Sequence, residues 1–322
     1  MVNPAETVRR PGGVWPRRRR AEGAVGISYE EIGQRLRAFR LGTGMSAEEI
    51  ARKLGISRTA VYRFEKGGVV KIETLISLAD LLQVSLPTLL GVETEYISSS
   101  VTYFERLRQL EESAERITIL AGPLSLLLSS DEFVERLEAL LKETAPEARE
   151  VRDRTERDVD RIVEILRERR ETYQRRKPTI VNLISALDIV RLLHSGFVGR
   201  PFIPRPDLKE RQKSAREEVE HIIRLMEEQP IGVQIGLVTG TLPHVGFQIF
   251  RSGEKRTLSV SPFRLGEQPN IRLGVAMITS TPEAVALHEK VVEQMWAESL
   301  KGKTAGRYLR DLISSLDKDL PR

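Results

Sequence analysis

The chain has no cysteine among its 322 residues. This absence excludes disulfides, thiolate nucleophiles and zinc or iron–sulfur sites that depend on cysteine. Histidine is scarce as well: the four histidines lie far apart, and none belongs to an H-x-x-x-H or H-E-x-x-H pattern. We therefore expect neither a metal site nor a bound cofactor.

Long apolar runs and catalytic motifs are also missing. The longest apolar stretch, residues 117–128, is interrupted by Gly122 and Pro123 and is shorter than the roughly 20 residues of a membrane span. The first residues contain no apolar signal core, which together with the lack of cysteine predicts a cytoplasmic protein without a membrane partner. Neither G-x-S-x-G nor G-x-G-x-x-G occurs, and we expect the protein not to be an enzyme.

The positive charge of the chain is concentrated near its start. The net charge is +5, and residues 1–27 contain six arginines against two glutamates. Residues 28–92 contain nine basic against seven acidic residues, whereas the rest of the chain has slightly more acidic than basic residues. This distribution predicts a nucleic-acid surface within the first 92 residues and not beyond them.

Residues 46–67, SAEEIARKLGISRTAVYRFEKG, have the pattern of two short helices joined by a tight turn. Ser46 and Glu49 have the S-x-x-E spacing of a capping box. Gly55 allows the positive φ that the turn needs, and Ser57 is placed to cap the second helix. The pattern predicts a helix-turn-helix whose second helix enters the major groove of DNA.

The outer face of that second helix suits DNA. It offers hydrogen-bond donors, a hydroxyl and an aromatic ring without an acidic residue, which matches acceptor-rich base edges and phosphates. The residues on this face are Arg58, Thr59, Tyr62, Arg63 and Lys66.

Residues 1–27 include RRPGGVWPRRRR, in which prolines and glycines stand beside four successive arginines. Such a segment cannot build a packed core, and we predict a disordered basic arm. The arm either contacts phosphates or the minor groove through its arginines, or is a solvated tail without a DNA role. The arginines concerned are Arg17, Arg18, Arg19 and Arg20.

Residues 28–92 as a whole predict a compact unit of five helices, because amphipathic segments follow one another with glycines between them. On the stretches MSAEEIARKLGISRTAVYRFEKG and IETLISLADLLQVSLPTLLG, this unit resembles the Cro/cI-type (XRE) family of DNA-binding domains. The resemblance implies a lambda-repressor-like fold. The sequence departs from the family pattern at two places. Ala47 stands where glutamine is common, and Val70-Lys71 stand where Pro-Ser is common.

The resemblance also implies roles for the residues of the second helix. Base contacts fall to Arg58, Thr59, Tyr62 and Arg63, and phosphate contacts fall to Lys66 and Ser57. Because Ala47 removes one contact that the family commonly makes, more of the recognition depends on those four base-contacting residues.

The remainder of the chain predicts a hinge and a second domain. Residues 93–101 carry three serines and predict a hinge linker. Residues 102–322 alternate helical and strand-like segments and predict an α/β or α+β domain with a sheet of about five or six strands. A long charged helix over 147–176 is either a helix of that domain or a dimer seam.

The second domain more weakly resembles the regulatory domains that follow this kind of helix-turn-helix in bacterial regulators, some related to the phospholipase D superfamily. The similarity is in ITILAGPLSLLL, PIGVQIGLV and AMITSTPEAVALHEKVVEQMW. Phospholipase D catalysis needs H-x-K-x4-D, and Met295 stands at the aspartate position after His288 and Lys290. The resemblance therefore implies a fold and no active site.

Basic residues beside the predicted strands and in a proline-rich loop are candidates for binding an anionic ligand. They are Arg200, Arg205, His244, Arg264 and Arg272.

Taken together, these patterns predict a bacterial, homodimeric transcriptional regulator that binds a double-stranded DNA operator of two half-sites. Its second domain would sense a small-molecule effector or hold the dimer together. One alternative is an antitoxin or partner-recruiting regulator whose second domain binds a protein. A further alternative, a DNA-targeted phosphodiesterase, conflicts with the missing aspartate.

Overall fold

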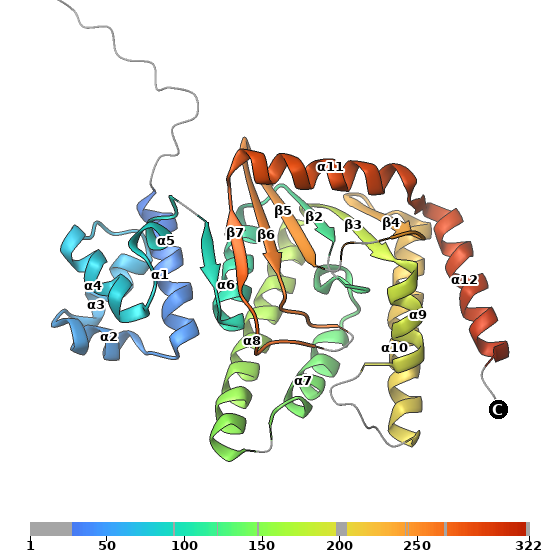
Figure 1. Cartoon of the computed structure of the whole chain (residues 1–322), viewed down its shortest axis with the longest axis horizontal. Helices are drawn as coiled ribbons and strands as arrows, with labels where there is room; N and C mark the ends of the chain where they lie inside the picture. The colour runs from blue at the N-terminus through green and yellow to red at the C-terminus, as the bar shows by residue number, and fades with distance from the viewer. Residues whose placement is uncertain are drawn as a thin grey trace, which may run out of the picture.

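The computed structural model describes residues 28–319, except residues 93, 121, 147, 198–204, 242, 244 and 267–268. In this part of the chain, an N-terminal helical unit stands beside a larger domain built around a mixed sheet (Figure 1). The expected multidomain fold, a helical domain followed by an α/β domain, is confirmed.

The N-terminal unit contains α1 (Tyr29–Thr43), α2 (Ala47–Leu54), α3 (Arg58–Glu65), α4 (Ile72–Leu82) and α5 (Leu86–Leu90). Its helix starts follow from local sequence, because serine side chains cap four of the five helices: Ser28, Ser46, Ser57 and Ser85. The unit has a packed apolar interior that includes Leu36, Ile50, Val61, Leu78 and Leu89. The expected five-helix unit is therefore present.

The connection between the two domains differs from the prediction. Residues 95–97 form strand β1 (Glu95–Ile97), which pairs antiparallel with β7 (Ala276–Thr279). Helix α6 (Ser100–Ser113) follows, capped by the Ser99 hydroxyl, while the Ser100 hydroxyl donates to the carbonyl of Ile271 at 2.6 Å. The prediction of a hinge linker over 93–101 is therefore wrong, because its serines cap and anchor a helix.

The sheet has eight strands in the order β1-β7-β6-β5-β2-β3-β4-β8. Strands β2 (Arg116–Leu120), β3 (Thr179–Ser185) and β4 (Val233–Val238) are parallel to one another. Strands β5 (Gly246–Ser252), β6 (Lys255–Ser261) and β8 (Leu300–Lys301) join by antiparallel pairing. The expected five or six strands were too few, because β1 and β8 have only three and two residues and leave little pattern in the sequence.

The two faces of the sheet bury different cores. Along β2, Ile117 and Ile119 belong to the larger core, whereas Leu120 belongs to a second one with Val285 and Met295 of α11 (Pro282–Glu298). The other helices of the domain are α7 (Phe133–Glu143), α8 (Arg149–Arg176), α9 (Ala186–Ser195), α10 (Arg205–Glu228) and α12 (Gly302–Asp319), with a short 3₁₀ turn at Leu126–Leu128. None of the helices in the described part of the chain combines the length and apolarity needed to cross a bilayer.

The long helix α8 is part of the domain's own core. Val159, Ile162 and Leu166, which form most of its apolar stripe, are almost fully buried, and α8 packs against α6 and α7. These three side chains are therefore already covered within the chain. The sequence predicted either a helix of the domain or a dimer seam, and in the structure α8 is a helix of the domain.

Candidate DNA interface and the contacts that hold it

Helix α3 places the predicted DNA-contacting residues together. The Ser57 hydroxyl accepts the amide of Ala60 at 3.1 Å and so fixes the start of the helix. Val61 and Phe64 are buried against the rest of the unit. The opposite face is exposed and carries Arg58, Thr59, Tyr62 and Arg63, with Lys66 at the C-cap.

Helix α2 and the turn after it fix the position of α3. Both bonds of the predicted capping box are present, from the Glu49 amide to the Ser46 hydroxyl at 3.1 Å and from the Ser46 amide to the Glu49 carboxylate at 2.7 Å. The bonds from the Ser46 amide and hydroxyl lower the pKa of Glu49 below its usual value. Gly55 ends α2 with a φ of 65°, a left-handed conformation that favours glycine.

Two arginines of α3 rest on aromatic rings. The guanidinium carbon of Arg58 lies 5.4 Å from the centroid of the Tyr62 ring, and its Nη2 lies 3.4 Å from the Tyr62 hydroxyl. Arg63 lies over Phe64 at the same centroid distance of 5.4 Å. Such contacts restrict the rotamers of exposed arginines.

Gly68 was not singled out from the sequence, yet it makes room for Arg63. A Cβ at this position would lie 2.6 Å from Cγ of Arg63 and 2.8 Å from its carbonyl oxygen. The glycine therefore permits the Arg63 side chain to lie where it does. The pair of glycines after α3 signalled a loop, but not this steric role.

The basic residues of the N-terminal unit fall into two groups. The first group, here called the outer bases, is exposed and makes no ion pair with any acidic residue in the described part of the chain. It consists of Arg52, Lys53, Arg58, Arg63, Lys66 and Lys71. The second group, the inner arginines, consists of Arg35, Arg37 and Arg40, each of which is paired with a carboxylate.

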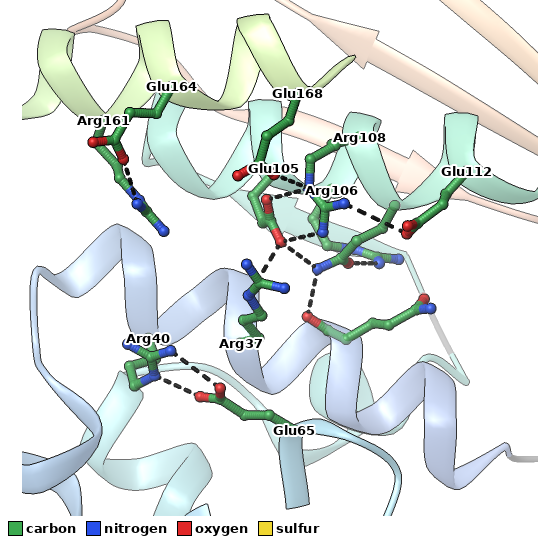
Figure 2. Close-up of polar contacts among 12 residues, drawn as sticks. Arg37, Arg40, Glu65, Glu105, Arg106, Arg108, Glu112, Arg161, Glu164 and Glu168 are labelled. Carbon is green, nitrogen blue, oxygen red and sulfur yellow. Dashed lines mark hydrogen bonds and ion pairs between the residues drawn. The ribbon is translucent and has the colours of Figure 1, made fainter. Parts of the chain in front are cut away.

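One inner arginine holds α1 against α3. Arg40 donates to both carboxylate oxygens of Glu65, at 2.5 and 3.1 Å (Figure 2). Glu65 is the single acidic residue of α3. Because it is turned toward Arg40 and buried, it adds no exposed negative charge to the DNA-facing side.

A second inner arginine joins the two domains through Glu95. Nε of Arg35 lies 2.8 Å from Glu95, and Arg106 of α6 makes two further bonds to the same carboxylate at 2.8 Å. Burial alone would raise the pKa of Glu95, but the charges and hydrogen bonds of Arg106 and Arg35 outweigh burial and lower it. The carboxylate is therefore charged and shared between a helix of each domain.

Further contacts between α1 and α6 extend this junction. The amide of Gln109 donates to the carbonyl of Gln34 at 2.9 Å, and Arg37 lies 3.6 Å from Glu105 of α6, which also binds Arg108 (Figure 2). Outside α6, Lys255 in β6 pairs with Glu31. These contacts hold the N-terminal unit, and with it α3, in one orientation on the second domain.

The predicted ligand residues do not come together as a set. Arg264 lines a cavity of about 690 Å³, whereas Arg272 is exposed on the loop before β7 and does not line it. Arg200 and His244 lie outside the described residues, as do the side chain of Arg205 and the arginines at 17–20.

The second domain presents no metal cluster among its described residues, since no three His, Asp or Glu side chains there could hold an ion. His288 lies on α11, where its Nδ1 contacts the carbonyl of Ala284 at 2.8 Å and its ring packs edge-on against Phe247. Met295 is buried in the second core.

Residues 36–89 match the family model for the helix-turn-helix. The N-terminal unit is a helix-turn-helix domain. This match covers the capped α2, the turn at Gly55 and the exposed face of α3, and it supports DNA as the binding partner of this domain.

Comparison of the whole structure finds TrmBL2, an archaeal chromatin protein whose structure is described as showing a novel mode of DNA binding. The TM-score is 0.30 at 13% sequence identity, and the match covers 71% of this chain and 60% of TrmBL2. No curated protein matches the chain.

Proposed function

We propose that the protein is a homodimeric, sequence-specific transcriptional regulator that binds operator DNA through α3. The observation that carries the proposal is the composition of the exposed α3 face. Donors from Arg58, Thr59, Tyr62 and Arg63 point outward, while the helix's own acid, Glu65, is turned inward. Within α3 no exposed carboxylate competes with these donors, which match the acceptors of the major groove.

The outer bases support the same surface. Arg52 and Lys53 on α2, and Lys71 just before α4, are exposed. We assign phosphate contacts to these residues together with Lys66 and Ser57, and base contacts to the α3 residues. For the arginines at positions 17–20, contact with DNA phosphates remains a prediction from the sequence.

Dimerisation and sensing belong to the same proposal. One chain presents one α3, and helix-turn-helix proteins commonly bind two half-sites about 34 Å apart. The second domain would join two chains and respond to an effector. We propose no catalytic role for it, because the buried Met295 occupies the position that the phospholipase D motif gives to aspartate.

Selection of duplexes from a randomised library with the full-length protein tests the proposal. We expect enrichment of two related half-sites separated by about one helical turn. Enrichment of one isolated half-site would contradict the dimer. If no sequence is enriched by the protein, the proposal of sequence-specific binding is wrong.

A further inference from the structure

The cavity beside Arg264 lies where open α/β sheets commonly bind ligands. Its walls include the ends of the parallel strands β2 and β3, at Leu120 and Ser185, and the start of β5. Sites at the carboxyl ends of parallel strands are the usual location in such folds. The volume of about 690 Å³ lies within the range of small-molecule sites.

Slightly more than half of the cavity wall is apolar. Leucine, phenylalanine and proline side chains come from α6, α7, α9 and the loops after β2 and β6. Examples are Phe104, Leu107, Leu126, Phe133, Leu187 and Phe263. A wall of this kind favours a ligand with an apolar body.

The charged groups of the wall differ in what neutralises them. Arg169 is buried and makes two bonds to Glu111, at 2.6 and 2.9 Å, and Arg191 pairs with Asp188. Arg264 is exposed and has no acidic partner within the described residues. Among the described lining residues, Arg264 is thus the charged side chain that has no oppositely charged partner. Its positive charge favours an anionic group on the ligand.

A buried amide adds a second polar feature. Gln248 lines the cavity from β5, and its side-chain oxygen is buried without a hydrogen-bond donor in the described part of the chain. A buried acceptor without a donor is destabilising, and a ligand hydroxyl or amide would satisfy it. Gln248 is opposite Ser259 of β6, whose hydroxyl lies 3.0 Å from that of Tyr103 on α6.

Helix α6 connects this cavity to the helix-turn-helix domain. Tyr103, Phe104 and Leu107 line the cavity. On the same helix, Glu105 and Gln109 contact α1 directly, and Arg106 reaches Arg35 of α1 through Glu95. The cavity and the junction between the domains therefore share helix α6.

The guanidinium of Arg169 strengthens this connection. It lines the cavity, binds Glu111 of α6 and lies 6.0 Å from the centroid of the Phe104 ring. A ligand that contacts Phe104 or Arg169 therefore acts directly on α6.

We propose that this cavity is an effector site for a small amphipathic organic anion and that α6 transmits its occupancy to the helix-turn-helix domain. The apolar body lies against α6 and the loop after β2, and the anionic group pairs with Arg264. An effector that fits one position of α6 better than another changes the affinity for DNA. Only this last step rests on the proposed function.

The site itself is tested without DNA, using 8-anilinonaphthalene-1-sulfonate, which has an aromatic body and a sulfonate. We expect the full-length protein to bind the probe with increased fluorescence. Arg264→Gln should weaken binding roughly fivefold, as for the loss of one charge-assisted contact. Arg272→Gln removes the same charge outside the cavity and should leave the affinity unchanged.

A second variant tests the site without disturbing the core. Leu187 lines the cavity but is 64% exposed, so Leu187→Asp should fold normally and repel an anion. Decanoate should displace the probe more effectively than 1-decanol, which has the same chain length without the charge. Equal probe binding by the wild type, Arg264→Gln and Leu187→Asp would overturn the site.

Transmission is tested in two ways. Decanoate should alter hydrogen exchange in α1 and α6 of the wild type but not of Leu187→Asp. It should also change the affinity for a selected duplex by roughly fivefold or more. If decanoate displaces the probe but changes neither exchange nor DNA affinity, the site stands and the transmission is wrong. Altered exchange in a protein that binds no DNA would instead overturn the proposed function alone.

Discussion

The inner arginines and the outer bases of the helix-turn-helix domain have the same charge but opposite surroundings. Arg35 and Arg40 are buried, and each is fixed by a carboxylate distant in sequence. The outer bases, such as Arg63 and Lys66, are exposed and make no such pair within the described residues. In the inner group, Arg40 fixes α3 within the domain, and Arg35 and Arg37 fix the domain on the rest of the chain. The outer group is left available for DNA.

This difference has an energetic side. A buried ion pair contributes little compared with apolar packing, but removing one partner leaves a charge without compensation and is strongly destabilising. An exposed basic residue leaves no buried charge behind when it is substituted. Its substitution therefore changes the affinity for a binding partner more than it changes the free energy of unfolding. The two groups should therefore separate cleanly in stability and in DNA affinity.

The largest effect is expected for Glu95→Ala. The change leaves Arg35 and Arg106 buried without their shared carboxylate, and should lower the free energy of unfolding by about 3–5 kcal/mol. Urea unfolding followed by circular dichroism measures it. Glu112→Ala is the matched control, because that carboxylate is 47% exposed and its pair with Arg108 is worth less than about 1 kcal/mol. Equal costs for the two variants would show that Glu95 does not compensate buried charge.

Protonation of Glu95 should have a smaller effect of the same sign, because the protonated carboxyl still fills its place. The neighbouring arginines hold the pKa of Glu95 below its usual value. Its contribution to stability is therefore complete above the unfolded pKa of about 4.3 and is lost as the pH falls through the lower folded value. Unfolding of the wild type and of Glu95→Gln across this range checks the sign. Their difference in stability should shrink toward low pH, and a difference that grows would refute it.

Among the outer bases, Arg63→Ala should reduce the affinity for a selected duplex by about 1–3 kcal/mol at one base position. The unfolding free energy should change by less than about 0.5 kcal/mol, since the side chain is exposed. Arg310→Ala on α12 removes another exposed positive charge far along the chain and controls for net charge. Unaltered affinity of Arg63→Ala across all sequences would remove Arg63 from the base contacts.

The smallest effect is expected at the edge of the domain junction. Lys255 pairs with Glu31 across the two domains, and both side chains are partly exposed. Lys255→Ala should cost less than about 1 kcal/mol in urea unfolding, and added salt should diminish the difference. A cost as large as that of Glu95→Ala would place this pair with the buried contacts.

The sequence was sufficient to predict features that depend on neighbouring residues. The capping box of Ser46 and Glu49, the turn at Gly55 and the exposed face of α3 all follow from spacings of a few residues. The same reasoning located the basic surplus. It could not separate the inner arginines from the outer bases, because the partners of Arg35 and Arg37 lie on β1 and α6.

Features that depend on distant pairing were missed. The segment at 93–101 was expected to be a hinge because its serines suggest flexibility, yet β1 pairs with β7 about 180 residues away. The cavity is likewise assembled from many separate segments, so Arg264 and Arg272 looked equivalent in the sequence although only Arg264 lines it.

The strand β1 has a consequence for operator architecture. Because α5 ends at Leu90 and β1 begins at Glu95, four residues connect the helix-turn-helix domain to the sheet, and we expect so short a connection to limit how far the domain adjusts its reach. Each inserted base pair rotates one half-site by roughly 34° about the DNA axis, since about 10.5 base pairs complete a turn. In a dimer of such chains we expect tolerance to half-site spacing to be narrow, so that one inserted base pair weakens binding more than many single base changes.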